Sequence, residues 1–193
     1  MSGHVAVTRA GAVTSIGIHR PERAQQALRR TWLGGLPEPW TFERSAGYAL
    51  THVVFHLTDW GRTPEGLPPD LADYLADWLP PWLDTCLDAR MWDLGCELLV
   101  VAASLPRPPD TAMFQDAWTR IARAQHETGA LLVEGPDPGE DDAAAAEPDF
   151  LHCYHSTLMA AFAAALTVER LTGGVDDDRA PYAGDMHGQG VPG

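Results

Sequence analysis

Apolar residues recur every three or four positions through most of this chain, which is the period of an amphipathic α-helix. Proline and glycine interrupt the pattern at short intervals and mark the ends of the segments. Only residues 4–18 alternate, and they predict an extended arm or a short strand. The helical segments expected from the pattern are 21–33, 43–60, 71–79, 82–90, 91–105, 112–128 and 150–171. The chain is therefore predicted to be all-α, with about six helices in antiparallel hairpins.

Capping residues refine these helices. Asp110 or Thr111 is expected to cap the helix at 112–128, and Asp149 the helix at 150–171. Pro80 and Pro81 are expected to break or kink the third helix, because proline lacks the backbone N–H that a helix interior needs.

A single domain follows from the length of 193 residues and the apolar fraction of 45%. The predicted division is an extended arm at 1–19, a helical domain at 20–174 and a flexible tail at 175–193. Within the domain, the acidic segment 135–149 has low complexity and predicts a mobile loop.

Charge and composition exclude several classes of function. The net charge of -14 disfavours nucleic acid and anionic membrane surfaces as partners. All 13 basic residues are arginines, so Schiff-base chemistry and a lysine base are excluded. No signal peptide or long apolar run is visible, and three cysteines without CxxC spacing suggest no disulfide framework. A cytoplasmic protein is predicted. The absence of lysine and asparagine also indicates a GC-rich genome, as in actinobacteria.

Two histidine pairs lie in the most apolar segments. His52 and His56 are four residues apart, and His152 and His155 are three apart, so each pair shares a face of its helix. A buried imidazole costs free energy unless it has a partner. Convergence of the two pairs would therefore create a site.

Carboxylates and a tyrosine extend this pattern. On a helical wheel Tyr48 and Asp59 fall on the same stripe as His52 and His56. Asp93 and Glu97 share a face of the fourth helix, a spacing that is more typical of a solvated surface but that could bring Glu97 to the imidazoles.

Imidazole and carboxylate ligands suit a divalent transition metal such as iron, zinc or copper. The residues between His52 and His56 lack the glutamate of zinc metalloproteases, and no helix carries the ExxH element of di-iron bundles. The alternative is purely structural, since helix histidines often bond a backbone carbonyl or a nearby acid. On that interpretation His152 would bond Asp149, and Asp59 would bond Arg62 or solvent. A Cys–His dyad at Cys96 or Cys153 would require a partner on another helix.

The strings YALTHVVFHLTDWG, DLGCELL and FLHCYHSTLMAAFAAAL resemble motifs of a poorly characterised actinobacterial all-α family associated with natural-product gene clusters. The resemblance covers about residues 43–171. It implies a helical-hairpin array, as in part of an α/α toroid, that a partner chain or second copy would complete. It also implies a polar centre formed by His52, His56, Asp59, Glu97, His152 and His155.

The sequence thus predicts a metal-dependent tailoring enzyme acting on a small molecule in bacterial secondary metabolism. The predicted metal ligands are His52, His56, His152 and His155, with Tyr48, Asp59 and Glu97 in catalytic roles. Two alternatives stay open: a non-catalytic subunit of a homo-oligomeric or heteromeric enzyme, and a metal-free His/Asp acid–base cyclase or isomerase.

Overall fold

The computed structural model describes residues 26–107, 110–135 and 148–177, with side chains described to residue 172. These residues form α-helices and short 3-10 turns, and none of them lies in a strand. The prediction of an all-α fold is confirmed. The predicted arm at 1–19, nearly all of the acidic loop at 135–149 and most of the tail at 175–193 lie outside the described residues.

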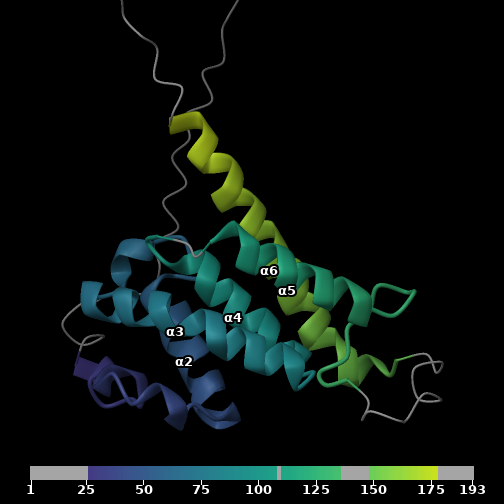
Figure 1. The fold of residues 1–193 in the computed structure, drawn as a ribbon, viewed down its shortest axis with the longest axis horizontal. Coiled ribbons are helices and arrows are strands. Elements are labelled where there is room, and N and C mark those ends of the chain that lie inside the picture. The colour runs from purple at the N-terminus through teal and green to yellow at the C-terminus, as the bar shows by residue number, and fades with distance from the viewer. Residues whose placement is uncertain (1–25, 108–109, 136–147, 178–193) are drawn as a thin grey trace, which may run out of the picture.

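Five α-helices make up the described bundle (Figure 1). In chain order they are α2 (Arg44–Leu57), α3 (Pro69–Asp88), α4 (Trp92–Ser104), α5 (Thr111–Ala124) and α6 (Phe150–Asp177). Three 3-10 turns, η1 (Leu33–Gly35), η2 (Pro39–Thr41) and η3 (Pro64–Gly66), join or precede them. Residues 26–28 are also helical, so the helix expected at 21–33 ends early in the described part.

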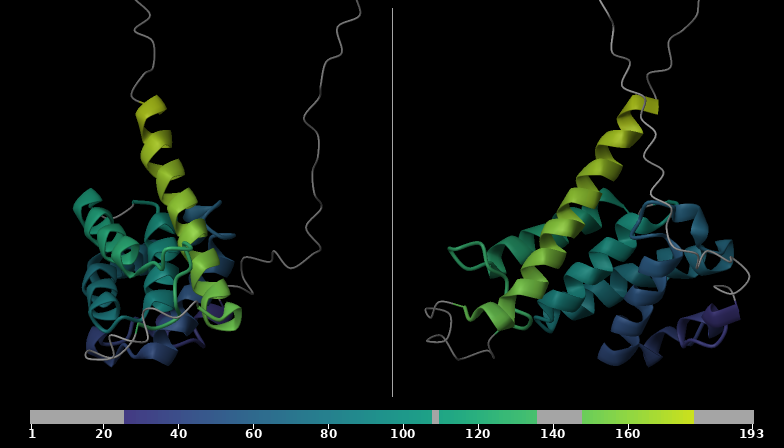
Figure 2. Two further views of the ribbon diagram at one scale, coloured as in Figure 1. Left: turned by 90° about the vertical axis from the view of Figure 1, so that its right-hand side faces the viewer. Right: turned by 180° about the vertical axis from the view of Figure 1, so that it is seen from behind.

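The centre of the bundle is α4, which packs against α2, α3 and α6, while α5 lies against α3 (Figures 1 and 2). Every residue from Asp93 to Ser104 is buried. A helix that is surrounded on all sides needs apolar residues around its whole circumference, and the sequence LLVVAA supplies them. Two carboxylates share this buried helix, which makes its first two turns unusual.

Of the break or kink predicted at Pro80 and Pro81, the break is wrong, because α3 continues through both prolines. Leu79, Trp82 and Leu83 on either side are buried in the core and hold this turn in place. Pro81 faces solvent, where water can satisfy a carbonyl that has lost its backbone donor. Burial of the apolar face has therefore outweighed the cost of the two missing N–H groups.

The expected caps are present, whereas the ends of several helices, α5 and α6 among them, differ from prediction. The Asp110 side chain accepts a hydrogen bond from the backbone N–H of Ala112 at 3.2 Å, and Asp149 accepts one from Leu151 at 3.4 Å. Helix α5 ends at Ala124, before the predicted 128, and α6 extends past the paired glycines to Asp177.

Helix α6 is the one described helix that is long and apolar enough to cross a membrane. An 18-residue window within its segment Phe150–Thr172 has a mean hydropathy of 1.2, and 39% of that window is buried in the bundle. Core helices of soluble proteins have the same length and composition, so this is weak evidence for a membrane span. One side of α6 contributes to the core beside α4.

Candidate functional site

Asp93 and Glu97 form the buried base of the candidate site, from one face of α4. Their exposed fractions are 5% and 2%. The prediction of a solvated face for this pair is therefore wrong, because α2 and α6 cover α4 at this point. Buried carboxylates need hydrogen-bond donors or a positive charge nearby. The neighbouring helices supply hydrogen-bond donors.

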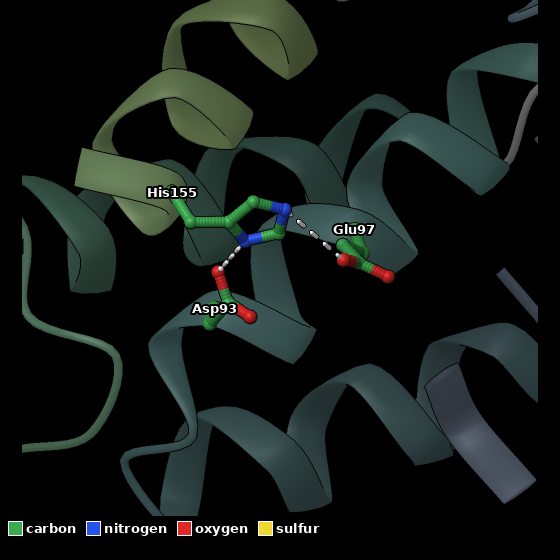
Figure 3. A group of neighbouring side chains, drawn as sticks. All are labelled: Asp93, Glu97 and His155. Carbon is green, nitrogen blue, oxygen red and sulfur yellow. Dashed lines mark hydrogen bonds and ion pairs between the residues drawn. The ribbon is translucent and has the colours of Figure 1, made fainter. Parts of the chain in front are cut away.

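His155 reaches the two carboxylates from α6 (Figure 3). Its Nδ1 lies 2.7 Å from Asp93 Oδ1, and its Nε2 lies 3.9 Å from Glu97 Oε1. A carboxylate can only accept, so Nδ1 carries the proton in this bond and Nε2 is turned toward Glu97. The imidazole is 43% exposed, so it joins the buried carboxylates to the protein surface.

Tyr48 holds the second oxygen of Asp93 from α2. Its hydroxyl donates to Asp93 Oδ2 at 2.9 Å. Burial and this hydrogen bond raise the pKa of Tyr48 well above its usual value. The phenol therefore keeps its proton and fixes Asp93.

Glu97 is the more deeply buried of the two carboxylates. Burial raises the pKa of Glu97, and the nearby Asp93 raises it further, whereas a hydrogen bond with Thr51 and the charges of His52 and His155 lower it. Thr51 Oγ1 also lies 2.9 Å from the carbonyl oxygen of Tyr48. The Thr51 hydroxyl donates to Glu97 Oε2, so its one proton is shared between the carboxylate and that carbonyl.

A short segment after α5 ties the two halves of the site together. The backbone N–H of Asp93 donates to the carbonyl of Val133 at 3.1 Å, and the N–H of Val133 donates to the carbonyl of His152 at 3.0 Å. Thr157 on α6 accepts from the backbone N–H of Leu131 at 2.9 Å. These bonds fix the first turn of α4 against the first turns of α6, and with it the distance between Asp93 and His155.

The predicted convergence of four imidazoles is wrong. His52, His56 and His152 are exposed, and of the four histidines only His155 lies with the buried carboxylates. Helix α2 turns Val54 and Phe55 inward, and that leaves His52 and His56 on the outer side. A helix with apolar residues on two faces does not reveal from its sequence which face will pack.

His52 nevertheless lies at the rim of the site. Its charge acts on Glu97, and its Nδ1 lies 2.7 Å from the carbonyl oxygen of Tyr48. A proton on Nδ1 directed at a carbonyl leaves Nε2 as the free nitrogen. His52 and His155 thus share one arrangement, in which Nδ1 is fixed by an oxygen acceptor.

His152 and Asp59 follow the structural alternative. His152 Nδ1 lies 3.2 Å from Asp149 Oδ2, the carboxylate that caps α6. Asp59 lies beyond the end of α2 with a positive φ of 47°, so it leaves the stripe predicted for it. Its carboxylate pairs with Arg62 at 3.7 Å.

The cysteines do not form the dyad that the sequence left open. Cys96 is buried beside the two carboxylates, which together with burial raise the pKa of its thiol to about 12. A thiol that stays protonated is a poor nucleophile. Cys153 is also buried, and its Sγ lies 3.7 Å from the carbonyl oxygen of Phe150.

A divalent cation fits the geometry of this group. One ligand atom each from Asp93, Glu97 and His155 lies within 4.8 Å of the others. Two atoms that each lie about 2.0–2.2 Å from one zinc ion can be no more than about 4.4 Å apart. The 3.9 Å between His155 Nε2 and Glu97 Oε1 satisfies this bound. Asp93, by contrast, is already placed to orient the imidazole.

Sequence reasoning selected Glu97 and His155 but left Asp93 and Thr51 out of the site. The signal for Asp93 was available, because a carboxylate one turn before Glu97 in the most apolar helix of the chain must share its environment. No signal distinguished Thr51, which is buried beside exposed His52.

Comparison with known proteins gives a family and no function. Residues 9–165 match the family described as a domain of unknown function, DUF6895. Neither a curated protein nor a solved structure matches the chain significantly.

Proposed function

The chain belongs to the DUF6895 family, and we propose that within it this protein is a metal-dependent enzyme whose ion is bound by Glu97 and His155. The observation that carries the proposal is the orientation of His155. Its Nδ1 is fixed by Asp93, and its Nε2 points at a second buried carboxylate. Histidines that bind metals commonly donate their other ring N–H to a carboxylate or carbonyl.

The surrounding residues support this assignment in distinct roles. Asp93 orients the imidazole, and Tyr48 fixes Asp93 in turn. His52 lies at the rim with its Nδ1 bonded to the carbonyl oxygen of Tyr48, outside the group of ligand atoms formed by Asp93, Glu97 and His155, and it supports the site rather than binding the ion. An imidazole and a carboxylate with open coordination positions suit zinc and non-haem iron.

The proposed substrate is a small neutral or cationic molecule. His155 is partly exposed, so a substrate can approach the ion from the side of α6. The net charge of -14 disfavours anionic polymers. When bound, the ion would polarise a substrate oxygen or activate a ligand. The cytoplasmic location and the role in bacterial secondary metabolism remain predictions from the sequence.

Metal analysis of protein purified without a histidine tag tests the proposal. We expect about one divalent transition metal per chain after reconstitution, measured by elemental analysis and by titration calorimetry with Zn²⁺ and Fe²⁺. His155→Ala should lose this binding, while His56→Ala should retain it. His56 is the matched control, because it is an exposed histidine on a neighbouring helix. Wild-type protein that binds neither metal would exclude the proposal.

One observation favours a second candidate, metal-free acid–base catalysis. The raised pKa of Glu97 makes it a candidate general acid, and the Asp93–His155 pair makes His155 a candidate base. Activity that persists after chelation and that falls with Glu97→Gln would support this alternative. Activity restored to a chelated enzyme only by added metal would support the first proposal.

A further inference from the structure

Helix α6 has two apolar faces, and only one of them is covered in the described structure. The inner face packs against α4, as expected for a core helix. The outer face exposes large apolar side chains, among them Leu151 at 71% and Leu158 at 62%. Exposed apolar residues that form one continuous face mark an interaction surface. The C-terminal part of α6 extends past the other helices (Figures 1 and 2).

The exposed face has the spacing of a coiled coil. Its residues follow one another at intervals of three and four, which is the a/d pattern of a heptad repeat. The outer seam, as we define it, consists of Leu151, Tyr154, Leu158, Ala161, Ala165, Val168 and Thr172. All seven are exposed, and together they span three heptads, about 32 Å at 1.5 Å per residue. Such a pattern is typical of a helix that pairs with another helix.

The outer seam is complementary in shape to itself when two copies run antiparallel. Its first half carries the large residues Tyr154 and Leu158, and its middle carries Ala161 and Ala165. An antiparallel pair centred between residues 161 and 162 places Leu158 of each copy against Ala165 of the other. Large residues then meet small ones, as close packing requires.

A groove beside the outer seam extends this complementarity. It lies between α5 and α6, has a volume of about 380 Å³, and is lined in part by Trp118, Ala160, Ala161 and Ala164. The hollow and the protruding leucine lie on the same helix. In a two-fold dimer each copy can therefore fill the groove of the other.

Charge also favours a second copy in this orientation. A net charge of -14 opposes self-association, and the outer seam, which has no charged residue, adds no repulsion between side chains at the contact. In the antiparallel register, Glu169 of one copy lies level with Tyr154 of the other, one residue from His155. An acidic residue thus lies near the exposed edge of an imidazole.

We propose that this protein forms an antiparallel homodimer through the outer seam of α6, which places Glu169 of each copy at the rim of the Asp93–Glu97–His155 site of the other. The dimer does not depend on the proposed metal chemistry, because seam residues hold the two copies together. It gives each site a residue that one chain alone cannot supply.

The oligomeric state in solution tests the dimer directly. Analytical ultracentrifugation of the full chain should give a reversible dimer whose fraction increases with concentration. Leu158→Glu should weaken the association at least about tenfold, because it buries a charge at the centre of the seam. Gln115→Glu, an exposed change on α5, is the matched control and should leave the association unchanged. Circular dichroism should be unaltered in both variants.

Cross-linking tests the antiparallel register. Ala161→Cys should form an intermolecular disulfide under mild oxidation, since residues 161 of the two copies meet near the two-fold axis. Leu151→Cys should not, because its two copies would lie about 32 Å apart along the pair. The three native cysteines are buried, so unmodified protein serves as the background.

Several outcomes would overturn the dimer. They are a wild-type chain that is monomeric at all concentrations, a Leu158→Glu variant that associates like the wild type, and cross-linking at residue 151 in place of 161. Binding of monomeric wild type to phosphatidylcholine vesicles would assign the face to a membrane instead. Wild-type protein that dimerises but binds neither Zn²⁺ nor Fe²⁺ would contradict the proposed function alone.

Discussion

Helices α4 and α2 each carry a pair of ionisable residues four positions apart in an apolar sequence, and the two pairs have opposite environments. Asp93 and Glu97 on α4 are buried, whereas His52 and His56 on α2 are exposed. The difference lies in what the neighbouring helices provide. Tyr48, Thr51 and His155 satisfy the carboxylates. An apolar sequence thus does not by itself bury a polar pair. A polar pair is buried where side chains on other helices provide hydrogen bonds to it.

The largest change in stability is expected when one member of each pair is removed. Asp93→Ala leaves the Tyr48 hydroxyl and His155 Nδ1 without their acceptor, and we expect a loss of about 2–3 kcal/mol in the free energy of unfolding. His56→Ala is the matched change on α2 and should stay within about 0.5 kcal/mol of wild type. Urea denaturation at pH 7 measures both. Equal losses in the two variants would show that the pairs do not differ as described.

The helices themselves were largely predictable from the sequence, because their apolar period and caps are local properties. Asp110 and Asp149 cap helices as expected. Failures occurred where tertiary packing decides. The sequence could not show that core contacts carry α3 through Pro80 and Pro81, or which face of α2 packs inward.

The site was predictable only in part, for the same reason. Glu97 and His155 were selected because polar residues in apolar helices need partners. Their mutual approach depends on the segment around Val133, which bridges α4 and α6 through backbone bonds. Hydrogen bonds between backbone groups do not depend on residue type, so the sequence does not reveal them. His52, His56 and His152 were selected by the same argument and lie on the surface.

A second test uses the pH dependence of stability. Since the pKa of Glu97 is raised in the folded state, the folded chain retains a proton that the unfolded chain loses as the pH passes its usual value near 4.5. Glu97 therefore lowers stability as the pH increases from there through the folded pKa. Glu97→Gln removes this effect.

We expect Glu97→Gln to equal wild type in stability near pH 4 and to exceed it at pH 7 in metal-free protein. Urea denaturation across this range measures the difference. A variant that is less stable than wild type at pH 7 would contradict a raised pKa at Glu97.

A third test concerns Thr51, which shares the buried side of α2. Thr51→Val keeps the shape of the side chain but removes the hydroxyl bonded to Glu97, and we expect a loss of about 1 kcal/mol at pH 7. Thr85→Val on α3 is the matched control, because its hydroxyl bonds a carbonyl at an exposed position. It should change stability by less than half as much. A Thr51→Val variant as stable as wild type would remove the hydroxyl from the site.

The smallest change in stability is expected for His52→Ala, a variant that also distinguishes the two histidines of α2. His52→Ala should change the free energy of unfolding by less than about 0.5 kcal/mol, because the side chain is exposed. Its charge nevertheless acts on Glu97, and its Nδ1 is fixed by Tyr48. We therefore expect it to weaken Zn²⁺ binding in calorimetric titration by about tenfold, in the range known for groups that support a metal site. His56→Ala should leave the affinity unchanged. If both variants bind Zn²⁺ like wild type, α2 contributes only Tyr48 and Thr51, and the buried pair on α4 functions without any histidine from the exposed pair.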